Sequence, residues 1–364
     1  KVLIPNLLSL TNKTKKKKKM SSHFKGDWKR RKLKKKIMLK TLLISSLVCL
    51  NFYSWAKTDT LRIAAVGDIM MGSGFPTPLL PADDAKGSFK AVLSPLRGAD
   101  LTFGNLEGVL LDEGHSNKCK GGSSCYAFRM PERYVNHLTD AGFDVMSVAN
   151  NHSGDFDDRG RVQTAKTLKE AGLLFAGFKT HPYTYFTKNG VKYGICAFAP
   201  NNGTVSFHDW VFARKLISEL KKQVDIVVVS FHGGGEGAKY QHITRSNEFF
   251  IGENRGNPYA FARMAIDSGA DVILGSGPHV TRAVDLYKNR FIAYSLGNFC
   301  TYGQFNLNGP NGVAPLLELN INKNGEFISA KITSIKQEKN KHMSVDPSGR
   351  AFQILKELTQ TDIP

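Results

Sequence analysis

Short apolar runs alternate along the chain with amphipathic segments, and most of the apolar runs end in a polar turn. The apolar runs have the length expected for buried strands of a mainly parallel sheet, and they lie at residues 61–66, 99–103, 145–149, 225–232 and 271–276. Helical spacing or helix caps are found at residues 133–141, 157–172, 210–222 and 258–268. This alternation predicts an α/β domain built from βα units.

The remaining segments predict antiparallel additions to this core. Residues 173–198 contain short strands around the turn Asn189-Gly190, and residues 315–336 contain two alternating strands around Asn324-Gly325. Residues 290–299 read as one strand with a polar end, and residues 349–358 as a closing helix. We find neither a short repeat nor a long linker, so a single folded domain is expected.

Polar side chains follow the predicted parallel strands at the points where the strands end. The densest cluster, at residues 150–155 (Asn-Asn-His-Ser-Gly-Asp), comes directly after an apolar run. Loops at the carboxyl ends of parallel strands converge on one edge of an open α/β sheet. A single such end is most often a turn or a helix cap. Five of them in one chain predict a shared site that contains Asp68, Glu107, Asn151, His152, His232 and His279.

These residue types point to metal chemistry. Carboxylates, an amide oxygen and imidazoles suit Mn²⁺, Zn²⁺ or Fe better than Ca²⁺. A carboxylate that bridges two ions lets a site activate water and bind a phosphoryl or carbonyl oxygen. His152 is then expected to protonate a leaving group, and Asp155 to orient a neighbouring side chain. The glycine-rich stretch 233–235 lacks the context of a phosphate-binding P-loop, and no serine at these strand ends lies in a Gly-x-Ser-x-Gly elbow.

Most of the net charge of +19 lies in the first 56 residues. This segment holds 16 Lys or Arg against one acid, Asp27, which leaves 34 basic and 30 acidic residues in 57–364. An apolar stretch follows at 41–56 and ends in Ser54-Trp55-Ala56, which predicts a secretory signal removed after Ala56. An uncleaved N-terminal anchor is the alternative, and it would be the protein's membrane contact.

Residues 57–364 are therefore expected to form the folded, exported part, in the periplasm or at the cell surface. With 41% hydrophobic and 22% charged residues, the composition is that of an ordinary globular protein. Because the basic excess is confined to the leader, nucleic-acid binding is not predicted for the folded part. Cys119 and Cys125 flank a short loop that a disulfide can close, whereas Cys196 and Cys300 are expected to be buried thiols.

Taken in order, the strand-end motifs resemble the capsule-synthesis CapA family of poly-γ-glutamate biosynthesis, over residues 61–319. The motifs are 67–72 (Gly-Asp-Ile-Met-Met-Gly), 105–108 (Asn-Leu-Glu-Gly), 149–155 (Ala-Asn-Asn-His-Ser-Gly-Asp), 232–236 (His-Gly-Gly-Gly-Glu), 277–280 (Gly-Pro-His-Val) and 294–299 (Tyr-Ser-Leu-Gly-Asn-Phe). That family is similar in fold to the calcineurin-like metallophosphatases, which implies a four-layer α/β/β/α sandwich with a metal site at the strand ends.

The resemblance also implies roles for individual residues. One or two divalent ions, Mn or Zn, would be bound by Asp68, Glu107, Asn151, His232 and His279. His152 would be the acid, and Glu236 and Asn298 would lie beside the metals or the substrate. The chain departs from the phosphatase pattern at Met70 and Gly277, which stand at usual histidine positions. Without these imidazoles, one metal position would be weak or empty.

The implied function is that of an exported protein of capsule or poly-γ-glutamate synthesis or export. It would act by metal-dependent hydrolysis of a phosphoester or an amide. Its implied partners are an anionic polymer or a phosphorylated or γ-glutamyl substrate, together with other capsule-synthesis proteins. The alternative is a catalytically silent scaffold or binding module for an anionic cell-surface polymer, and metal content separates the two hypotheses.

Overall fold

The computed structural model describes residues 60–118 and 126–363. The predicted leader and the predicted Cys119–Cys125 disulfide lie outside the described residues. Within the described ranges, no helix is long and apolar enough to cross a membrane. Cys196 and Cys300 are buried free thiols, which confirms the prediction from their apolar contexts.

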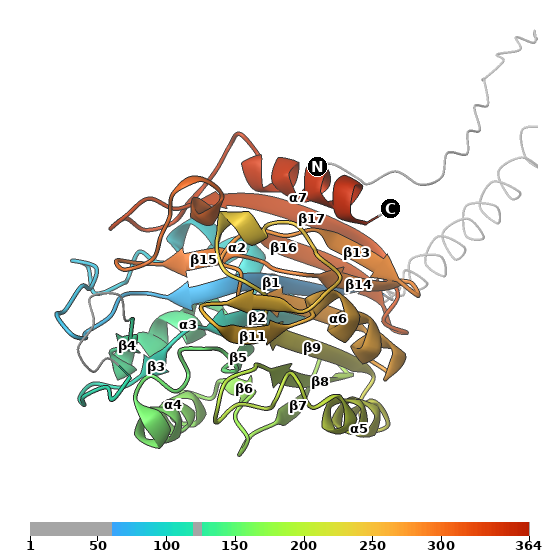
Figure 1. The fold of residues 1–364 in the computed structure, drawn as a ribbon, viewed down its shortest axis with the longest axis horizontal. Helices are drawn as coiled ribbons and strands as arrows, with labels where there is room; N and C mark the ends of the chain where they lie inside the picture. Colours follow the sequence, from blue (N-terminus) through green and yellow to red (C-terminus); the bar gives the residue numbers. More distant parts are fainter. Residues whose placement is uncertain (1–59, 119–125, 364) are drawn as a thin grey trace, which may run out of the picture. The chain divides into compact units, whose positions relative to one another are not determined.

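Two large sheets form the body of this part of the chain (Figure 1). The first has eight strands in the order β18-β17-β16-β1-β2-β5-β6, and β15 also pairs with β1. Its strands are β1 (Thr60–Met70), β2 (Leu101–Leu106), β5 (Val145–Ser147), β6 (Leu174–Ala176), β15 (Asn298–Thr301), β16 (Val313–Asn322), β17 (Phe327–Lys336) and β18 (Ser344–Val345). Because β1, β2, β5 and β6 run parallel, their carboxyl ends share one edge of the sheet.

The second sheet has six strands in the order β13-β14-β12-β9-β8-β7. They are β7 (Tyr183–Lys188), β8 (Val191–Phe198), β9 (Ile226–His232), β12 (Val272–Ser276), β13 (Val284–Tyr287) and β14 (Arg290–Ala293). The four central strands are parallel, and β7 and β13 are antiparallel edges. The predicted hairpin at Asn189-Gly190 is thus confirmed as the turn between β7 and β8. Two short pairs complete the strands of the described residues: β3 (Val109–Leu110) with β4 (Arg129–Met130), and β10 (Glu248–Phe250) with β11 (Glu253–Gly256).

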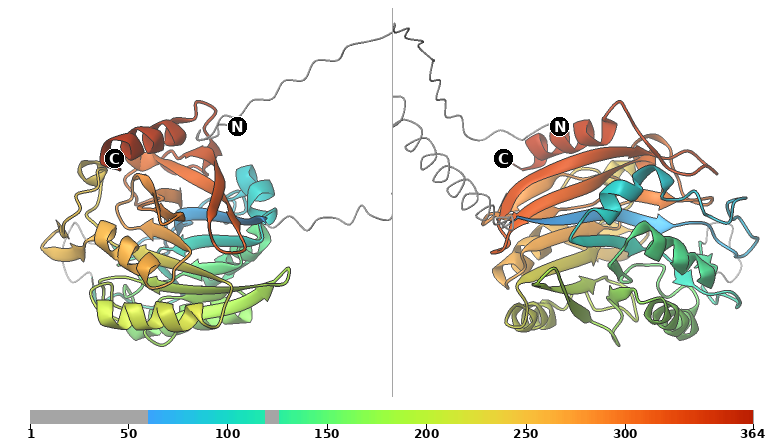
Figure 2. Two further views of the ribbon diagram at one scale, coloured as in Figure 1. Left: turned by 90° about the vertical axis from the view of Figure 1, so that its right-hand side faces the viewer. Right: turned by 180° about the vertical axis from the view of Figure 1, so that it is seen from behind.

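The sheets pack face to face, and helices cover both outer faces (Figure 2). Side chains alternate along each strand, so Ile63 of β1 joins Val228 of β9 in the core between the sheets, while Val66 faces outward. The outer face of the eight-stranded sheet packs on α2 (Leu93–Arg97), α3 (Val135–Ala141) and α4 (Asp157–Glu170). The other outer face packs on α5 (Trp210–Lys221) and α6 (Pro258–Asp267). The predicted four-layer α/β/β/α sandwich is confirmed.

The remaining helical segments lie at the margins of the sandwich. The last helix, α7 (Arg350–Asp362), packs against β16 and β17. Short 3₁₀ helices are found in the connections: η1 (Lys90–Val92), η2 (Glu132–Tyr134), η3 (Ala238–Tyr240) and η4 (Gly309–Gly312).

The segment 290–299 is not the single strand expected from its apolar pattern. It contains β14 and β15, which belong to different sheets, and the chain crosses between the sheets at Gly297, where φ is 64°. The Gly297 carbonyl accepts a hydrogen bond from the backbone N–H of Asp68 at 2.9 Å. Gly67 permits this close crossing, because a Cβ at that position would collide with the same carbonyl oxygen. The crossing places Asn298 beside Asp68 and prolongs β1 beyond its predicted end.

Candidate metal centre

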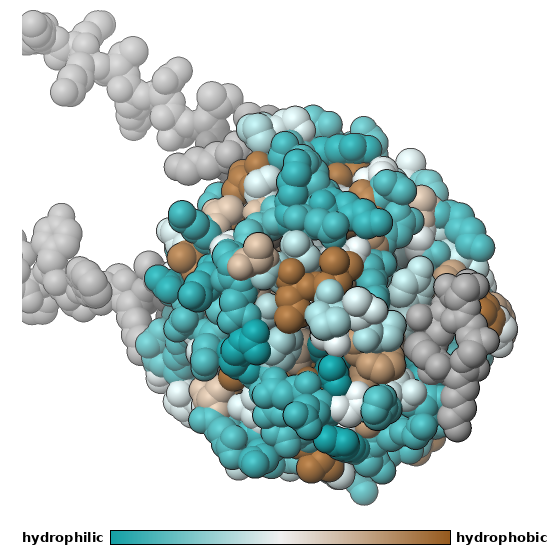
Figure 3. All heavy atoms as spheres, turned by 90° about the vertical axis from the view of Figure 1, so that its left-hand side faces the viewer, coloured by the Kyte–Doolittle hydropathy of each residue, from teal (hydrophilic) through white to brown (hydrophobic). Residues whose placement is uncertain are grey.

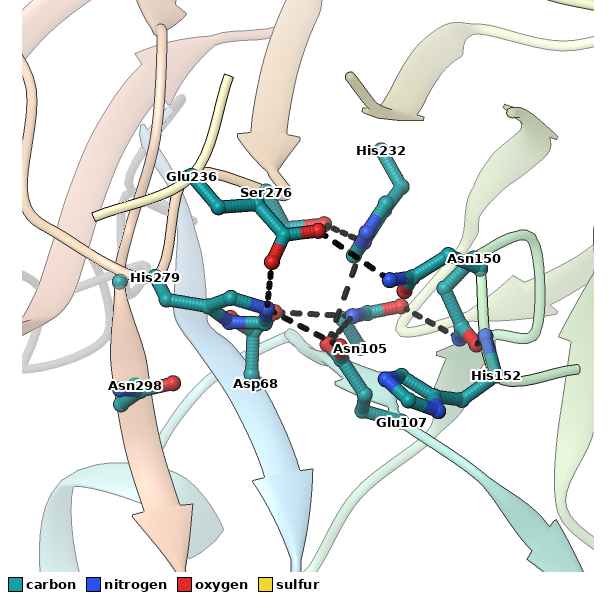
Figure 4. A network of polar contacts seen from close by, with 12 residues as sticks. Asp68, Asn105, Glu107, Asn150, His152, His232, Glu236, Ser276, His279 and Asn298 are labelled. Atoms are coloured by element: carbon teal, nitrogen blue, oxygen red, sulfur yellow. Dashed lines mark hydrogen bonds and ion pairs between the residues drawn. The ribbon is translucent and has the colours of Figure 1, made fainter. Parts of the chain in front are cut away.

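The loops that follow parallel strands of both sheets meet at one edge of the sandwich (Figure 4). This edge lies on the left of Figure 1, and Figure 3 shows the same face, which is mainly hydrophilic with hydrophobic patches near its middle. Every predicted site residue is found here: Asp68 in β1, Glu107 after β2, Asn151, His152 and Asp155 after β5, His232 at the end of β9, Glu236 in the following loop, His279 after β12 and Asn298 at the start of β15.

A compact group of two carboxylates and one imidazole lies at the centre. His279 Nδ1 is 2.9 Å from Asp68 Oδ2, and His279 Nε2 is 3.4 Å from Glu107 Oε1. The three residues offer ligand atoms that all lie within 4.8 Å of one another. Asp68 and Glu107 are completely buried. A buried group of this composition is suited to a divalent cation, which would compensate the carboxylate charge.

Asn105, whose role the sequence analysis missed, holds the two carboxylates at this spacing. Its Nδ2 donates to Asp68 Oδ1 at 2.9 Å and to Glu107 Oε2 at 3.1 Å. Asn150 in turn donates to Asn105 Oδ1 at 3.2 Å and to the Leu106 carbonyl at 2.8 Å. Asn150 therefore orients Asn105 from the loop after β5. A signal was present in the sequence, since residues two apart on a strand face the same side and Asn105 precedes Glu107 by two.

Buried polar atoms without a hydrogen-bond partner in the described structure gather around this group. They include Glu107 Oε1, Asn151 Oδ1 and His232 Nε2, each a possible metal ligand, and of these Glu107 Oε1 lies 3.4 Å from His279 Nε2 as an ion pair. Buried polar atoms in proteins are almost always hydrogen-bonded, so three such atoms without a hydrogen bond at one site indicate a missing partner. A divalent ion fits, because all three atoms are electron-pair donors of the predicted type once His232 Nε2 is unprotonated.

Burial and charge set the protonation of these groups. Burial raises the pKa of Glu107 well above its ordinary value, and the Asp68 carboxylate raises it further. Burial alone lowers the pKa of His279, but the charge of Glu107 and the hydrogen bond with Asp68 outweigh it and raise the pKa to about 10. Burial and the nearby Arg255 guanidinium hold the pKa of His232 well below its ordinary value, so His232 is neutral and able to bind a metal.

His152 lies at the margin of the centre in a dyad with Asp155. His152 Nδ1 is 2.7 Å from Asp155 Oδ2, which also accepts the backbone N–H of Phe128 at 2.7 Å. The other oxygen of Asp155 pairs with Lys118 Nζ at 2.5 Å. The His152 ring packs on Phe128 at a centroid distance of 4.1 Å. Burial lowers the pKa of His152, and the charge and hydrogen bond of Asp155 oppose this shift without reversing it.

A second missed residue, Arg255 of β11, orients Glu236. Arg255 is 1% exposed, and its guanidinium donates to Glu236 Oε1 at 2.9 Å. Asn151 Nδ2 donates to the same oxygen at 3.2 Å, and Glu236 Oε2 lies 3.9 Å from His279 Nε2. Sequence patterns gave no signal for Arg255, because it precedes an ordinary helix cap and lies far along the chain from the other site residues.

Met70 and Gly277 stand where the phosphatase pattern has histidine, and each has a structural role in this chain. Met70 is fully buried, and its sulfur accepts the backbone N–H of Gly72 at 3.3 Å. Gly277 has a φ of 116°, and a Cβ there would lie 2.8 Å from the backbone of Gly233. The loops after β9 and β12 thus approach too closely for a side chain at 277.

The fold and these strand-end groups define an α/β/β/α sandwich with a candidate metal centre at the edge where the strand ends of both sheets meet. The family described as "Bacterial capsule synthesis protein PGA_cap" matches residues 62–302, and the chain belongs to this family. This confirms the resemblance that the motifs indicate.

Named relatives are also similar to this chain. The chain is 30% identical over 264 residues to "Capsule biosynthesis protein CapA" of Bacillus anthracis, covering 67% of this chain and 60% of that protein. It is 28% identical over 257 residues to "PGA biosynthesis protein CapA" of Bacillus subtilis strain 168, covering 66% of this chain and 63% of that protein. The chain therefore spans less than two thirds of the length of either relative.

The solved structures have lower sequence identity to this chain than these relatives. A hypothetical protein from Thermus thermophilus superposes with a TM-score of 0.47 at 15% identity, covering 76% of this chain and all of that one. The NAD nucleotidase of Haemophilus influenzae superposes with a TM-score of 0.40 at 12% identity, covering 83% of this chain and 56% of that one.

Proposed function

We propose that this protein is an exported, metal-dependent hydrolase of a phosphoester or an amide that acts in capsule or poly-γ-glutamate synthesis or export. The observation that carries the proposal is the convergence of unpaired buried donor atoms of Glu107, Asn151 and His232. His279 lies against both Glu107 and Asp68, and the three residues offer ligand atoms within 4.8 Å of one another. These five residues would hold one or two divalent ions, Mn or Zn. When bound, such ions supply Lewis-acid polarisation of the reacting oxygen and activation of water.

The protein's own residues have distinct tasks in this reaction. Asn105 fixes the separation of Asp68 and Glu107, so the ligand geometry is set before a metal binds. His152 borders the adjoining cavity, and its Nδ1 is held by Asp155. In the protonated ring, Nε2 is then left to donate a proton to a leaving group. The buried walls exclude water from the carboxylates and strengthen every charge interaction in the site.

The cellular setting is part of the proposal. Export to the periplasm or cell surface is supported by the leader pattern at residues 1–56, and an uncleaved leader would tether the protein to the membrane. The names of the Bacillus relatives support a task in capsule synthesis beside other capsule-synthesis proteins. The substrate would be an anionic polymer or a phosphorylated or γ-glutamyl compound, and nucleic acid is not a proposed partner.

The test combines metal analysis with a hydrolysis screen on the purified full chain. We expect Mn²⁺ or Zn²⁺ to co-purify or rebind, and the loaded protein to cleave p-nitrophenyl phosphate, a phosphodiester or a γ-glutamyl anilide. Glu107→Gln should lose both metal and activity. Glu318→Gln is the matched control and should keep both, because Glu318 lies in β16 and pairs with Lys331 rather than with a residue of the metal centre. Wild-type protein that binds neither metal would contradict the proposal.

A second function is favoured by the missing imidazoles at Met70 and Gly277. In this alternative, the protein is a catalytically silent scaffold that binds an anionic cell-surface polymer. It predicts polymer binding that is unchanged in the Glu107→Gln variant, together with no hydrolysis of any compound in the screen.

A further inference from the structure

One carboxylate oxygen of Glu236 accepts hydrogen bonds from two different side chains. Arg255 Nη1 donates to Glu236 Oε1 at 2.9 Å, and Asn151 Nδ2 donates to the same oxygen at 3.2 Å. The other oxygen, Oε2, lies 3.9 Å from His279 Nε2 at the margin of the metal centre (Figure 4). Glu236 is not part of the group whose ligand atoms all lie within 4.8 Å of one another. Its contacts therefore connect the centre with a buried arginine.

The side-chain amide of Asn151 can be turned in two ways that have nearly the same shape. Its nitrogen carries two donor hydrogens, whereas its oxygen only accepts. A divalent cation binds the oxygen of an amide and is repelled by the N–H groups. Asn151 is therefore a good ligand only if its nitrogen has a partner elsewhere and its oxygen is left for the ion.

The contacts of Glu236 make this choice. The Arg255 guanidinium has only donors, and the carboxylate of Glu236 that pairs with it has only acceptors. The atom of Asn151 that lies 3.2 Å from this carboxylate must then be the nitrogen, because an oxygen there would place two acceptors against each other. Asn151 Oδ1 is left buried and without a hydrogen bond among the described residues.

Arg255 and the loop that carries Glu236 are held in fixed positions. Arg255 is 1% exposed, and its carbonyl accepts the backbone N–H of Gly234 at 2.9 Å. At the other end of the β10–β11 hairpin, Glu248 accepts the backbone N–H of Gly235 at 2.8 Å. Arg282 holds Glu248 with two bonds, of 2.9 and 2.7 Å. The loop after β9 is thus attached to the hairpin at both ends of the hairpin, and the direction of Glu236 is set before a metal binds.

We propose that Arg255 and Glu236 are positioning residues of the metal centre, which turn the amide of Asn151 so that its oxygen is left to bind the ion. Glu236 acts through Asn151 and is not itself a ligand. The inference rests on the metal centre of the proposed function, but it requires no hydrolysis.

The test measures Mn²⁺ affinity by isothermal titration of the full chain. Glu236→Met removes the acceptor, and we expect the affinity to fall by about 10–100-fold, the usual effect of losing an outer partner of a metal ligand. Glu236→Gln removes the same charge but keeps an oxygen, which Arg255 turns toward itself because it has only donors. Glu236→Gln should therefore lose clearly less affinity than Glu236→Met.

A second comparison repeats Glu236→Met in an Asn151→Ala background. Because no amide is left to orient, the double variant should bind metal like Asn151→Ala alone. A contribution of Glu236 through its charge or as a direct ligand would persist in this background. Zn²⁺, which binds such sites more tightly, replaces Mn²⁺ where the affinity is too low to measure.

Glu253→Met is the matched control. Glu253 Oε2 lies 3.6 Å from the same Arg255 nitrogen, but the side chain is 59% exposed and contacts no residue of the metal centre. This variant should bind metal like the wild type. Thermal unfolding verifies that each variant is folded, and Glu236→Ala repeats the measurement if Glu236→Met is not.

The outcomes separate this inference from the proposed function. Metal binding without hydrolysis, with the variants ordered as expected, supports the positioning role and contradicts only the hydrolase. An unchanged Glu236→Met variant overturns the positioning role, and so do equal losses in Glu236→Met and Glu236→Gln. A loss that persists in the Asn151→Ala background, or one that the Glu253→Met control shares, also overturns it. Wild-type protein that binds neither Mn²⁺ nor Zn²⁺ overturns both proposals together.

Discussion

His279 Nδ1 lies 2.9 Å from Asp68 Oδ2, although 211 positions separate the two residues in the sequence. One imidazole thereby connects the end of β1 in the eight-stranded sheet with the loop after β12 in the six-stranded sheet. Its other nitrogen lies 3.4 Å from Glu107. The candidate metal centre is therefore built from residues of both sheets.

Replacing His279 should weaken metal binding sharply. His279→Gln removes an imidazole that faces both buried carboxylates, and loss of even an outer partner of a metal ligand costs about 10–100-fold in affinity. We expect Mn²⁺ or Zn²⁺ affinity, measured by isothermal titration, to fall by at least that factor. His208→Gln, which changes an exposed histidine bonded to the Asn254 carbonyl, should bind metal like the wild type. Equal affinities in all three proteins would remove His279 from the ligand set.

His152 should affect turnover without affecting metal content. His152→Ala deletes the proposed proton donor, and general acid catalysis contributes about 10²–10⁴-fold to a rate. The expected result is a loss of kcat in this range on whichever compound the wild type cleaves, with the metal content unchanged by elemental analysis. Asp155→Asn should cause a smaller loss, because it disturbs the orientation of the ring and leaves the ring in place. A His152→Ala variant that loses its metal would instead place His152 among the ligands.

A side chain should not be tolerated at position 277. Gly277→Ala combines a φ of 116° with a Cβ that would lie 2.8 Å from the backbone of Gly233. The left-handed conformation costs about 1–2 kcal/mol for a non-glycine residue, and overpacking adds about 1–3 kcal/mol. Gly172→Ala is the matched control, since its φ is 73° and nothing lies within 4 Å of its Cβ position.

In urea unfolding, Gly277→Ala should therefore lose clearly more stability than Gly172→Ala. Similar losses in the two variants would show that the loops after β9 and β12 can separate. Histidine could then be introduced at 277 to test whether it strengthens metal binding.

Asp346 should make the stability of the protein depend on pH in the acidic range. Its carboxylate accepts the backbone N–H groups of Ser348 at 3.0 Å and Arg350 at 3.2 Å, just before α7. Burial raises the pKa of Asp346, but the hydrogen bonds from Ser348 and Arg350 outweigh it and hold the pKa below its ordinary value. Because the folded-state pKa is lowered, the stabilisation is complete above the unfolded pKa of about 3.9 and is lost as the pH falls through the folded value.

Asp346→Ala should cost about 1 kcal/mol at pH 7, the usual net contribution of a hydrogen bond. Urea midpoints measured from pH 7 down through this acidic range should show the difference between variant and wild type shrinking as Asp346 becomes protonated. A constant difference would mean that the charge of Asp346 has no part in the effect.

The sequence by itself determined the elements and the list of candidate groups. Alternation of apolar and polar residues is a local property, so β9, α5 and α6 lie within a residue or so of their predicted bounds. The strand-end residues followed from the same pattern, since a parallel strand that becomes polar at its carboxyl end contributes to one shared edge. The order of the motifs was sufficient to indicate the family.

Tertiary structure alone decided which groups touch and which are left unpaired. Residues 290–299 form one apolar run, yet the run is divided between the two sheets at Gly297. The division follows from the pairing of β15 with β1. Arg255 and Asn105 acquire their roles only through contacts with Glu236 and Asp68. Such contacts join residues distant in sequence, and no local periodicity encodes them. Position 277 likewise has no room for a histidine because the loops after β9 and β12 come close together there. Only the folded chain brings these two loops into contact.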